Sequence, residues 1–302
     1  MIRSVGLIGA GAVGAYFIWG TEDVHDIDFY LIAEGERRER LLSEGLLING
    51  KLYRLPVLTP EEAHEKGCDL ILLAVKYGGL TSALSEIERA VCDHTLVMSL
   101  LNGIDSEELI AERIGERRVV RALMQIASRR ADGKIEFDPE KTVGVFYGGK
   151  DEKTIDELTA FFAGTKVNYH ISDDIIQSQW NKFRINICYN IPQALLSVGY
   201  GAYFTSEHVQ YMLRALEAEL IQVAAAEGIT IEPLELVSQG YAQNARYSTL
   251  QDLDAGRHTE IDMFLGTIMK KGEEHGIPTP VSAYTYHAIK ALEEKNDGIF
   301  DF

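Results

Sequence analysis

Three polar side chains recur at four-residue intervals in the second half of the chain: Lys182, Asn186 and Asn190. Residues four apart share one face of a helix, so this spacing groups an ammonium with two carboxamides. The flanking Phe183 and Ile187 are apolar and indicate a largely buried helix, where an ammonium needs partners or a ligand. A lysine in such a place can have its pKa lowered and serve as a proton donor. A polar stripe on a surface helix is the alternative.

A second pattern, at the start of the chain, suits an anionic ligand. The G-x-G-x-x-G run comprises Gly9, Ala10, Gly11, Ala12, Val13 and Gly14. It follows the apolar stretch 5–8 and precedes the helix-compatible stretch 15–19. In that setting the glycines allow a tight turn, let backbone N–H groups approach a pyrophosphate, and let the helix pack close to its strand. The run predicts a dinucleotide-binding loop, with an ordinary glycine turn as the alternative.

Polar residues that follow the next apolar segments are further candidates, because ligands of an open parallel sheet bind beyond the carboxyl ends of its strands. Glu34 follows the second strand-like segment, Lys76 the third and Asn102 the fourth. Glu34 lies twenty residues after Gly14, where a carboxylate accepts hydrogen bonds from a ribose diol. We expect Lys76 and Asn102 to face the nicotinamide. A solvated strand end or a turn is the alternative for each.

The elements that must position these residues alternate in type through the first half. Apolar strand-like segments at 2–8, 28–32, 69–75, 95–100 and 119–126 alternate with helical ones, which predicts a parallel sheet with crossover helices. Segments 134–137 and 142–147 flank the turn signal Asp138-Pro139 and predict a hairpin at the sheet edge. A helix over 154–162 and a strand over 166–169 complete this half.

The second half is predicted to be helical. The patterns cover 175–197, 206–227, 234–245, 260–275 and 281–296. Gly228 and Gly276 among the breaks suit helix C-termini. We therefore expect an α/β Rossmann NAD(P)-binding domain over 1–172 and an all-α domain over 173–302, with the active site in the cleft between them.

Composition narrows the classes of partner and compartment. Lys+Arg 29 against Asp+Glu 46 gives a formal charge of −17, which disfavours nucleic acid and anionic membranes as partners. No apolar run approaches the roughly 18 residues of a membrane span, and no leader precedes the first strand, so we expect a cytoplasmic protein. Cys68, Cys92 and Cys188 are too few and too scattered for a disulfide framework or a zinc site. We expect reduced thiols and no metal.

Together these motifs resemble the ketopantoate reductase (2-dehydropantoate 2-reductase) family over essentially the whole chain. The resemblance rests on the glycine loop, Val75-Lys76, Leu101-Asn102-Gly103, the helix 180–186 with Asn190, and the segment 248–252 followed by 256–262. It implies a Rossmann domain followed by a helical domain of the 6-phosphogluconate-dehydrogenase type, in agreement with the expected architecture.

The resemblance implies NADPH-dependent reduction of the ketone of 2-dehydropantoate to (R)-pantoate, a step that supplies pantothenate. Lys182 would protonate the alkoxide as hydride arrives, and Glu260 would help to position substrate and lysine. Because hydride addition builds negative charge on oxygen, a preplaced ammonium stabilises the transition state. The substrate-binding positions would be Asn186, Asn190 and Ser248. A helix-start carboxylate is the alternative for Glu260, and a loop cap is the alternative for Ser248.

The cofactor is the point on which residues and resemblance disagree. Many family members place an arginine after the second strand to hold the 2′-phosphate, whereas this chain has Glu34. Arg37 and Arg38 follow closely, and the alternative is that they bend back and receive the phosphate of NADPH. The resemblance implies NADP(H), while Glu34 favours NAD(H). We expect NADH to be used at least as well as NADPH.

Other functions stay open at this point. A hydroxy-acid or opine dehydrogenase, or a reductase of another small 2-oxo acid, would share the fold and the lysine. A non-catalytic NAD(P)-binding sensor would keep the glycine loop and have no use for Lys182 with Glu260. The helical domain is also compatible with a homodimer.

Overall fold

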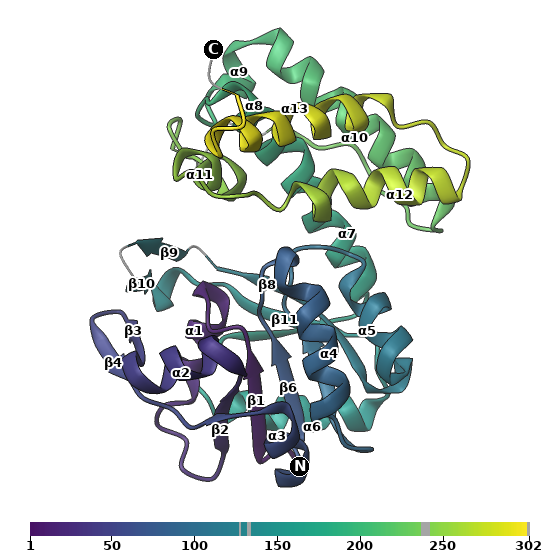
Figure 1. Cartoon of the computed structure of the whole chain (residues 1–302). Coiled ribbons are helices and arrows are strands. Elements are labelled where there is room, and N and C mark those ends of the chain that lie inside the picture. The colour runs from purple at the N-terminus through teal and green to yellow at the C-terminus, as the bar shows by residue number, and fades with distance from the viewer. Residues whose placement is uncertain (127, 132–133, 237–241, 301–302) are drawn as a thin grey trace. The chain divides into compact units, whose positions relative to one another are not determined.

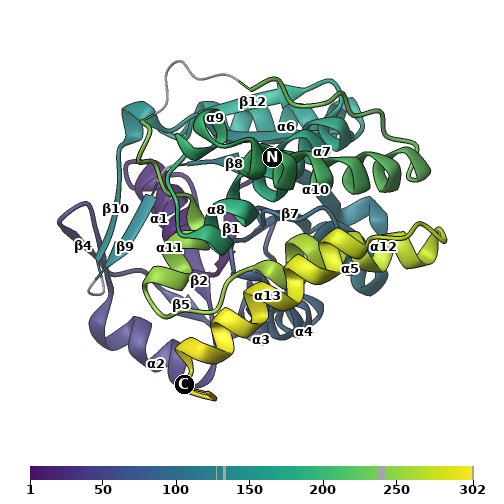
Figure 2. The ribbon, with the colours of Figure 1, turned by 90° about the horizontal axis from the view of Figure 1, so that it is seen from above.

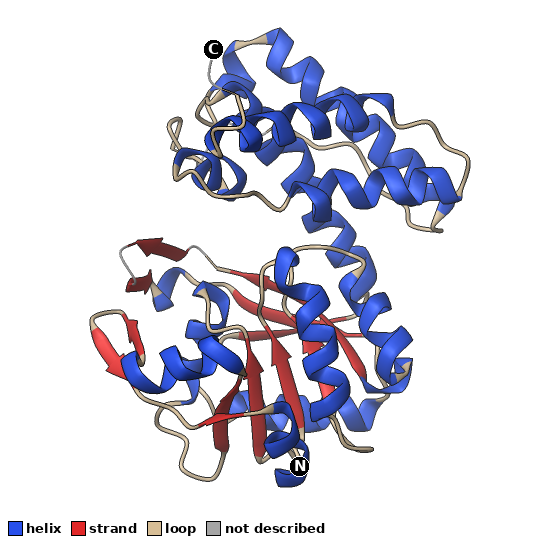
Figure 3. Ribbon diagram, in the orientation of Figure 1, coloured by secondary structure: helices blue, strands red, loops and turns tan. Residues whose placement is uncertain are grey.

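The structure is a computed structural model that describes residues 1–126, 128–131, 134–236 and 242–300. The chain divides into two compact units, unit 1 (Met1–Ser178) and unit 2 (Gln179–Phe302). Strands form the centre of unit 1, while the described part of unit 2 consists of helices and loops (Figure 3). The division follows Ser178, whereas the sequence pattern places the boundary after Ser172.

Unit 1 is built on an eight-stranded sheet with the order β12-β11-β8-β7-β6-β1-β2-β5 (Figure 1). Its strands are β1 (Ser4–Ile8), β2 (Asp28–Ile32), β5 (Val57–Leu58), β6 (Leu70–Leu73), β7 (Leu96–Ser99), β8 (Val119–Gln125), β11 (Gly144–Gly148) and β12 (Tyr169–Ser172). Neighbouring strands are parallel except β8 and β11. The residues of β6 are all buried, as expected for a parallel strand covered on both faces. The predicted parallel sheet is confirmed.

Helices connect these strands and a smaller sheet packs beside them. The helical segments are α1 (Ala12–Thr21), α2 (Gly35–Glu44), α3 (Pro60–Lys66), η1 (Tyr77–Gly79), α4 (Leu80–Ala90), α5 (Ser106–Ile114), η2 (Glu116–Arg118), η3 (Pro139–Lys141) and α6 (Glu152–Ala163). The second sheet has the order β4-β3-β10-β9, from Lys51–Tyr53, Leu46–Ile48, Lys134–Phe137 and Ser128–Ala131 (Figure 2). Helix α1 contacts it through Tyr16 and Trp19, whose rings lie 5.5 and 5.9 Å from that of Phe137.

The hairpin predicted around Asp138-Pro139 is wrong, because its two strands belong to different sheets. Strand β10 pairs antiparallel with β9, with Phe137 opposite Ser128, and β11 pairs antiparallel with β8. Pro139 begins the short helix η3 and Asp138 caps it. The segment between β10 and β11 therefore carries the chain from one sheet to the other instead of reversing it within one sheet.

The strand predicted over 166–169 is also displaced, since β12 begins only at Tyr169. The backbone N–H groups of Lys166 and Asn168 donate to the Gly20 carbonyl and the Tyr16 hydroxyl, at 2.8 and 2.9 Å. Because these N–H groups donate to residues of helix α1, they do not take part in hydrogen bonds between strands.

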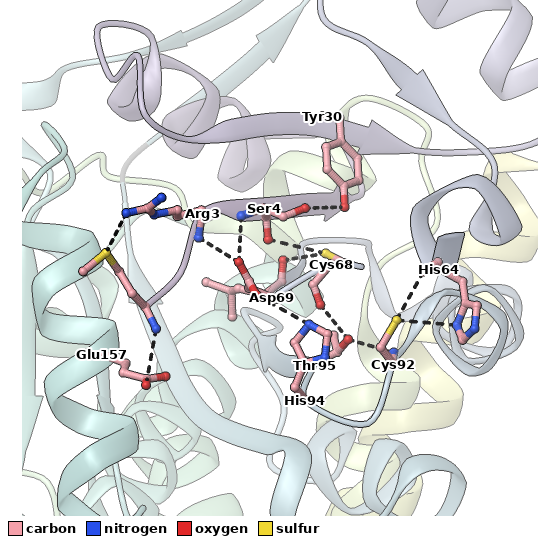
Figure 4. A network of polar contacts seen from close by, with 12 residues as sticks. Arg3, Ser4, Tyr30, His64, Cys68, Asp69, Cys92, His94, Thr95 and Glu157 are labelled. Atoms are coloured by element: carbon pink, nitrogen blue, oxygen red, sulfur yellow. Dashed lines mark hydrogen bonds and ion pairs between the residues drawn. The ribbon is translucent and has the colours of Figure 1, made fainter. Parts of the chain in front are cut away.

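A polar network secures the amino ends of β1, β6 and β7 (Figure 4). The Asp69 carboxylate accepts from the backbone N–H groups of Arg3 and Ser4 at 2.8 and 3.0 Å. The Thr95 hydroxyl donates to the Cys68 carbonyl at 2.6 Å. The thiols of Cys68, Cys92 and Cys188 are free, and Cys68 and Cys188 are buried. This network belongs to the end of the sheet opposite the glycine loop.

Unit 2 is an assembly of helices. They are α7 (Ile175–Ile185, which begins before the division), the π-helix η4 (Asn186–Asn190), α8 (Ile191–Leu196), α9 (Ala202–Thr205), α10 (Glu207–Ala226), α11 (Ser248–Asp254), the π-helix η5 (Asp262–Gly266), α12 (Thr267–Glu274) and α13 (Pro280–Asn296). Gly228 and Gly276 follow helix ends with φ of +78° and +67°, which confirms the predicted C-terminal positions. In the part of the chain that the structure describes, no helix is long and apolar enough to cross a membrane.

The helix predicted over 234–245 is absent from its described residues, 234–236 and 242–245. Residues 237–241 lie outside the described part. The carbonyls of Gln243 and Ala245 accept hydrogen bonds from Gly201 and Tyr200, at 2.8 and 3.1 Å. These carbonyls therefore bond to another segment and not within a helix, and the next helix, α11, begins further along the chain, at Ser248.

Candidate active site

The three glycines of the loop between β1 and α1 have different steric roles. Gly9 has φ +100°, and a Cβ there would lie 2.5 Å from the Ala74 carbonyl carbon. A Cβ on Gly14 would lie 2.2 Å from the Gly9 oxygen, so α1 packs directly on the end of β1. At Gly11 the nearest atom would be 4.0 Å away. The first and third glycines therefore serve the turn and the packing, and the second leaves room for a ligand.

The amino terminus of α1 presents backbone donors beside that room. Gly11 is its N-cap and no side chain caps the helix, so the N–H groups of Ala12 and Val13 receive no side-chain acceptor there. A helix N-terminus with free amides and a positive dipole end attracts a phosphate. The loop therefore fits the pyrophosphate of a dinucleotide.

The sheet order places the other predicted cofactor residues along one edge. Strands β7, β6, β1 and β2 are consecutive and parallel, so their carboxyl ends lie side by side. Asn102 follows β7, Lys76 follows β6, and Glu34 follows β2, with the glycine loop after β1. The chain turns toward opposite sides of β1 to form β2 and β6, which makes this edge the topological switch point where doubly wound sheets bind ligands.

Glu34 does not stand alone, a feature that the sequence pattern did not reveal. Arg89 on α4 donates to both Glu34 carboxylate oxygens, at 2.6 and 3.0 Å, and to Glu61 at 2.7 Å. Glu34 and Arg89 are 55 residues apart, so no local spacing signals the pair. Arg37 pairs with the buried Glu86, and Arg38 lies 3.4 Å from Glu62.

Side chains next to Lys76 and Asn102 link the ends of β6 and β7. The Tyr77 hydroxyl donates to the Asp105 carboxylate at 2.8 Å. Between the end of β7 and the start of α5, the buried Ser99 and Ser106 hydroxyls lie 2.8 Å apart, and the Ser106 hydroxyl donates to the Glu107 carboxylate at 2.8 Å. These contacts hold the two strand ends that carry Lys76 and Asn102.

In unit 2, Lys182 lies in α7, and Asn186 and Asn190 are the first and last residues of η4. Residues eight apart in a regular α-helix drift by about 80° around the axis. The wider π turn rotates less per residue and so reduces this drift between Lys182 and Asn190. The predicted common face is thus improved by a local departure from α-helical geometry.

Lys182 and Glu260 are close enough to interact electrostatically. Burial lowers the pKa of Lys182 to about 8, and the negative charge of Glu260 opposes that shift. Glu260 precedes η5, and η5 packs against η4. The structure therefore brings together two residues that are 78 positions apart in the sequence.

Asn190 and Ser248 also meet, with the Asn190 amide 3.4 Å from the Ser248 hydroxyl. Gln193 holds the segment before Ser248: its amide donates to the Ala245 carbonyl at 2.9 Å and accepts from the Tyr247 N–H at 2.6 Å. The Asn186 amide nitrogen is buried and has no hydrogen-bond partner among the residues that the structure describes. Such a donor is available to a ligand.

Unit 2 thus contains Lys182, Asn186, Asn190, Ser248 and Glu260, and unit 1 contains the glycine loop, Glu34, Lys76 and Asn102. Sequence reasoning missed Arg89 and Gln193, which contact predicted site residues or their immediate neighbours. Both act through contacts distant in sequence. Within the described residues, no group of three His, Cys, Asp or Glu side chains is arranged to hold a metal ion.

Two family descriptions match this chain one after the other. Residues 5–145 match "Ketopantoate reductase PanE/ApbA", and residues 174–293 match "Ketopantoate reductase PanE/ApbA C terminal". The chain belongs to the ketopantoate reductase family. Membership confirms the expected oxidoreductase class and the Rossmann domain followed by a helical domain.

Individual proteins agree with this membership in the ketopantoate reductase family. The chain is 29% identical over 300 residues to a 2-dehydropantoate 2-reductase of Pyrococcus horikoshii, covering 97% of this chain and 98% of the relative. A PanE/ApbA family ketopantoate reductase from Ralstonia eutropha JMP134 has a similar structure, with TM-score 0.78, 25% identity and coverage of 98% and 100%. A D-mandelate dehydrogenase solved with NADH and anilino(oxo)acetate shares the fold, with TM-score 0.82, 23% identity and coverage of 98% and 99%.

Proposed function

We propose that this protein reduces 2-dehydropantoate to (R)-pantoate with a reduced nicotinamide dinucleotide. The observation that carries the proposal is the desolvated Lys182 beside Glu260, on a face shared with Asn186 and Asn190. A sensor that only binds nucleotide has no need of this arrangement. When bound, the nicotinamide supplies the hydride that the ketone carbon accepts.

Lys182 is the proton donor in this proposal. With a pKa of about 8, its side chain is mostly an ammonium at neutral pH, yet it gives up a proton more readily than an exposed lysine. The ammonium faces the substrate oxygen, on which negative charge grows, and transfers its proton to that oxygen. Glu260 keeps the lysine protonated until then.

Asn186, Asn190 and Ser248 bind the substrate in this proposal. Asn186 offers a buried amide donor, and the Asn190–Ser248 pair offers an amide and a hydroxyl within hydrogen-bond reach of one another. Such groups suit the carboxylate and the hydroxyl of a small 2-oxo acid. Orientation by these bonds places the carbonyl oxygen toward Lys182.

The substrate assignment is tested with 2-dehydropantoate and 2-oxoisovalerate, which lacks the hydroxymethyl group. A site that hydrogen-bonds a hydroxyl discriminates against the analogue by about 10⁴-fold in kcat/KM, and we expect a preference of that order. Equal efficiency with both would leave a reductase of another small 2-oxo acid. Nucleotide binding without turnover of any 2-oxo acid would favour the sensor.

For the cofactor, we propose that NADH is used at least as well as NADPH. Glu34 follows β2 on the ribose side of the glycine loop, and Arg37 and Arg38 are paired with Glu86 and Glu62. Arg37 is held by the buried Glu86, and an exposed ion pair of the kind that Arg38 could form with a 2′-phosphate contributes only about 0–1 kcal/mol, so these arginines give a 2′-phosphate little advantage. Glu34→Arg should shift the kcat/KM ratio toward NADPH. A strong NADPH preference of the unmodified protein would contradict this proposal.

A homodimer and a cytoplasmic location stay predictions. Light scattering of the purified protein tests the first, and cell fractionation tests the second. Neither nucleic acid nor a membrane is part of the proposed function, in keeping with the formal charge of −17.

A further inference from the structure

The segment that carries Glu260 is fastened to helix α13. The Glu293 carboxylate oxygen Oε1 accepts from the Thr259 N–H at 2.7 Å and from the Thr259 hydroxyl at 2.6 Å. The Thr259 hydroxyl oxygen in turn accepts from the Ile261 N–H at 3.2 Å. The residues on both sides of Glu260 are therefore fixed through one carboxylate.

Two other side chains of α13 contact Asp262, which lies two residues after Glu260. Asp262 accepts from the Tyr286 hydroxyl at 2.5 Å and lies 3.4 Å from the Lys290 ammonium. Together with Thr259, this gives α13 contacts before and after Glu260. The α13 contacts also reach η5 itself, the helix that follows Glu260.

Glu293 is a buried carboxylate, 2% exposed, and burial of a carboxylate is costly unless it is hydrogen-bonded and paired. The basic side chains around it are Lys290, at 2.9 Å, and His258, at 3.6 Å. His258 also contacts Asp297 at 2.9 Å. Since both Thr259 donors meet one oxygen, the geometry of the Glu260 segment depends on this acceptor.

We propose that Glu293 is a positioning residue: by binding the backbone and hydroxyl of Thr259, it sets the place of Glu260 relative to Lys182. The proposal rests on the proposed function for the role of Glu260 in turnover. Its structural part, the coupling of Glu293 to Lys182 through Glu260, does not depend on which substrate is reduced.

Two variants distinguish the effect of the hydrogen-bond acceptor of Glu293 from the effect of its charge. Glu293→Met removes both the oxygen acceptor and the charge at similar volume, whereas Glu293→Gln removes only the charge and keeps a carbonyl that can accept both Thr259 bonds. Glu227→Gln is the matched control, because Glu227 in the same unit binds Lys271 and His275, at 3.0 and 2.6 Å, away from segment 258–262.

The measurement is the pKa of the Lys182 ammonium, followed by NMR of the full-length protein with isotope-labelled lysine. We expect Glu293→Met to lower this pKa by about 0.5 to 1 unit, because Glu260 then opposes the desolvation of Lys182 less well. Glu293→Gln and Glu227→Gln should leave it near the wild-type value. In a Glu260→Gln background, Glu293→Met should cause no further shift.

The alkaline limb of kcat for ketone reduction should move to lower pH by the same amount in Glu293→Met. If Glu293→Met does not fold, Thr259→Val removes the hydroxyl, which donates to Glu293 and accepts from the Ile261 N–H, but keeps the Thr259 backbone bond to Glu293, and it should give a smaller shift in the same direction. An unchanged pKa in folded Glu293→Met, or an equal shift without Glu260, overturns the positioning role. Because the NMR measurement needs no substrate, absence of reductase activity would contradict the proposed function alone.

Discussion

The ammonium of Lys182 is subject to two opposing effects. Desolvation lowers its pKa, the Glu260 carboxylate raises it again, and the balance is about 8. A free lysine has a pKa near 10.4 and is a weaker acid by roughly two units. The structure thus supplies an acid that is protonated at neutral pH and still able to donate.

Lys182→Ala should lower kcat for ketone reduction by about 10²- to 10⁴-fold, the usual contribution of a positioned proton donor. The Kd for the nucleotide should change little, because the glycine loop lies in the other unit. Steady-state kinetics and nucleotide titration measure the two effects. Lys270→Ala, which removes an exposed lysine paired only weakly with Glu274, is the control. Near-normal turnover of Lys182→Ala would exclude Lys182 from proton transfer.

Glu260→Gln should move the alkaline limb of the pH profile for reduction below pH 8. The ammonium is the active form, so activity falls as pH rises through the pKa of Lys182. Loss of the carboxylate removes the negative charge that raises this pKa. The kcat profile between pH 6 and 10 measures the change, and circular dichroism checks the fold. A limb that stays in place would leave Glu260 as a helix-start residue only.

At the scale of elements, two glycines of the β1–α1 junction have different roles, one in packing and one in leaving room for a ligand. A Cβ at Gly14 would collide with the Gly9 oxygen at 2.2 Å, whereas the nearest atom to a Cβ at Gly11 would be the Ala74 oxygen, at 4.0 Å. The same motif therefore contains one position that the fold requires and one that a ligand requires.

Gly11→Ala should raise the Kd for the dinucleotide by on the order of tenfold, or about 1.4 kcal/mol, with at most about 1 kcal/mol lost from the free energy of unfolding. Gly14→Ala should lower the free energy of unfolding by about 1–3 kcal/mol because α1 is pushed from β1. Calorimetric titration and denaturant unfolding without nucleotide measure the pair. The reverse order of effects would contradict the roles assigned to the two glycines.

The two π-helices are the elements that most closely shape the helical unit's site. Helix η4 carries Asn186 and Asn190, η5 follows Glu260, and the two pack together. Wider turns of this kind are often found at functional sites. Here η4 brings the polar side chains closer to one face, and η5 begins at Asp262, which α13 contacts through Tyr286.

On the scale of the whole molecule, the residues that we propose for nucleotide binding and for proton transfer lie in different compact units. A ligand that binds only the folded glycine loop stabilises that folded form by mass action, by about 2.7 kcal/mol at a hundredfold excess over Kd. That energy corresponds to roughly 5–10 °C in a domain of this size.

NADH at such a concentration should therefore raise the melting temperature of the transition that belongs to unit 1, as scanning calorimetry can measure. Gly11→Ala, at the same nucleotide concentration, should show a smaller increase. An equal increase in wild type and Gly11→Ala would place nucleotide binding elsewhere in the molecule.

Local sequence determined much of this protein. The strand over 28–32, the helix of α13 and the glycine turn follow from side-chain period, apolar runs and positive φ, which act within a few residues. The four-residue spacing of Lys182, Asn186 and Asn190 likewise places them on one helix. The order of elements was therefore sufficient to predict a parallel sheet followed by helices.

Tertiary structure decided the pairings between distant segments. The partner of β11 is β8 and not β10, segment 242–245 serves as an acceptor for the loop at 200–201, and Glu34 is held by Arg89. Thr259, next to Glu260, donates to Glu293, 34 residues further along the chain. Hydrogen bonds and ion pairs of this kind depend on which surfaces the folded chain brings together. The periodicity of apolar residues and the secondary-structure propensity of each residue do not predict those contacts.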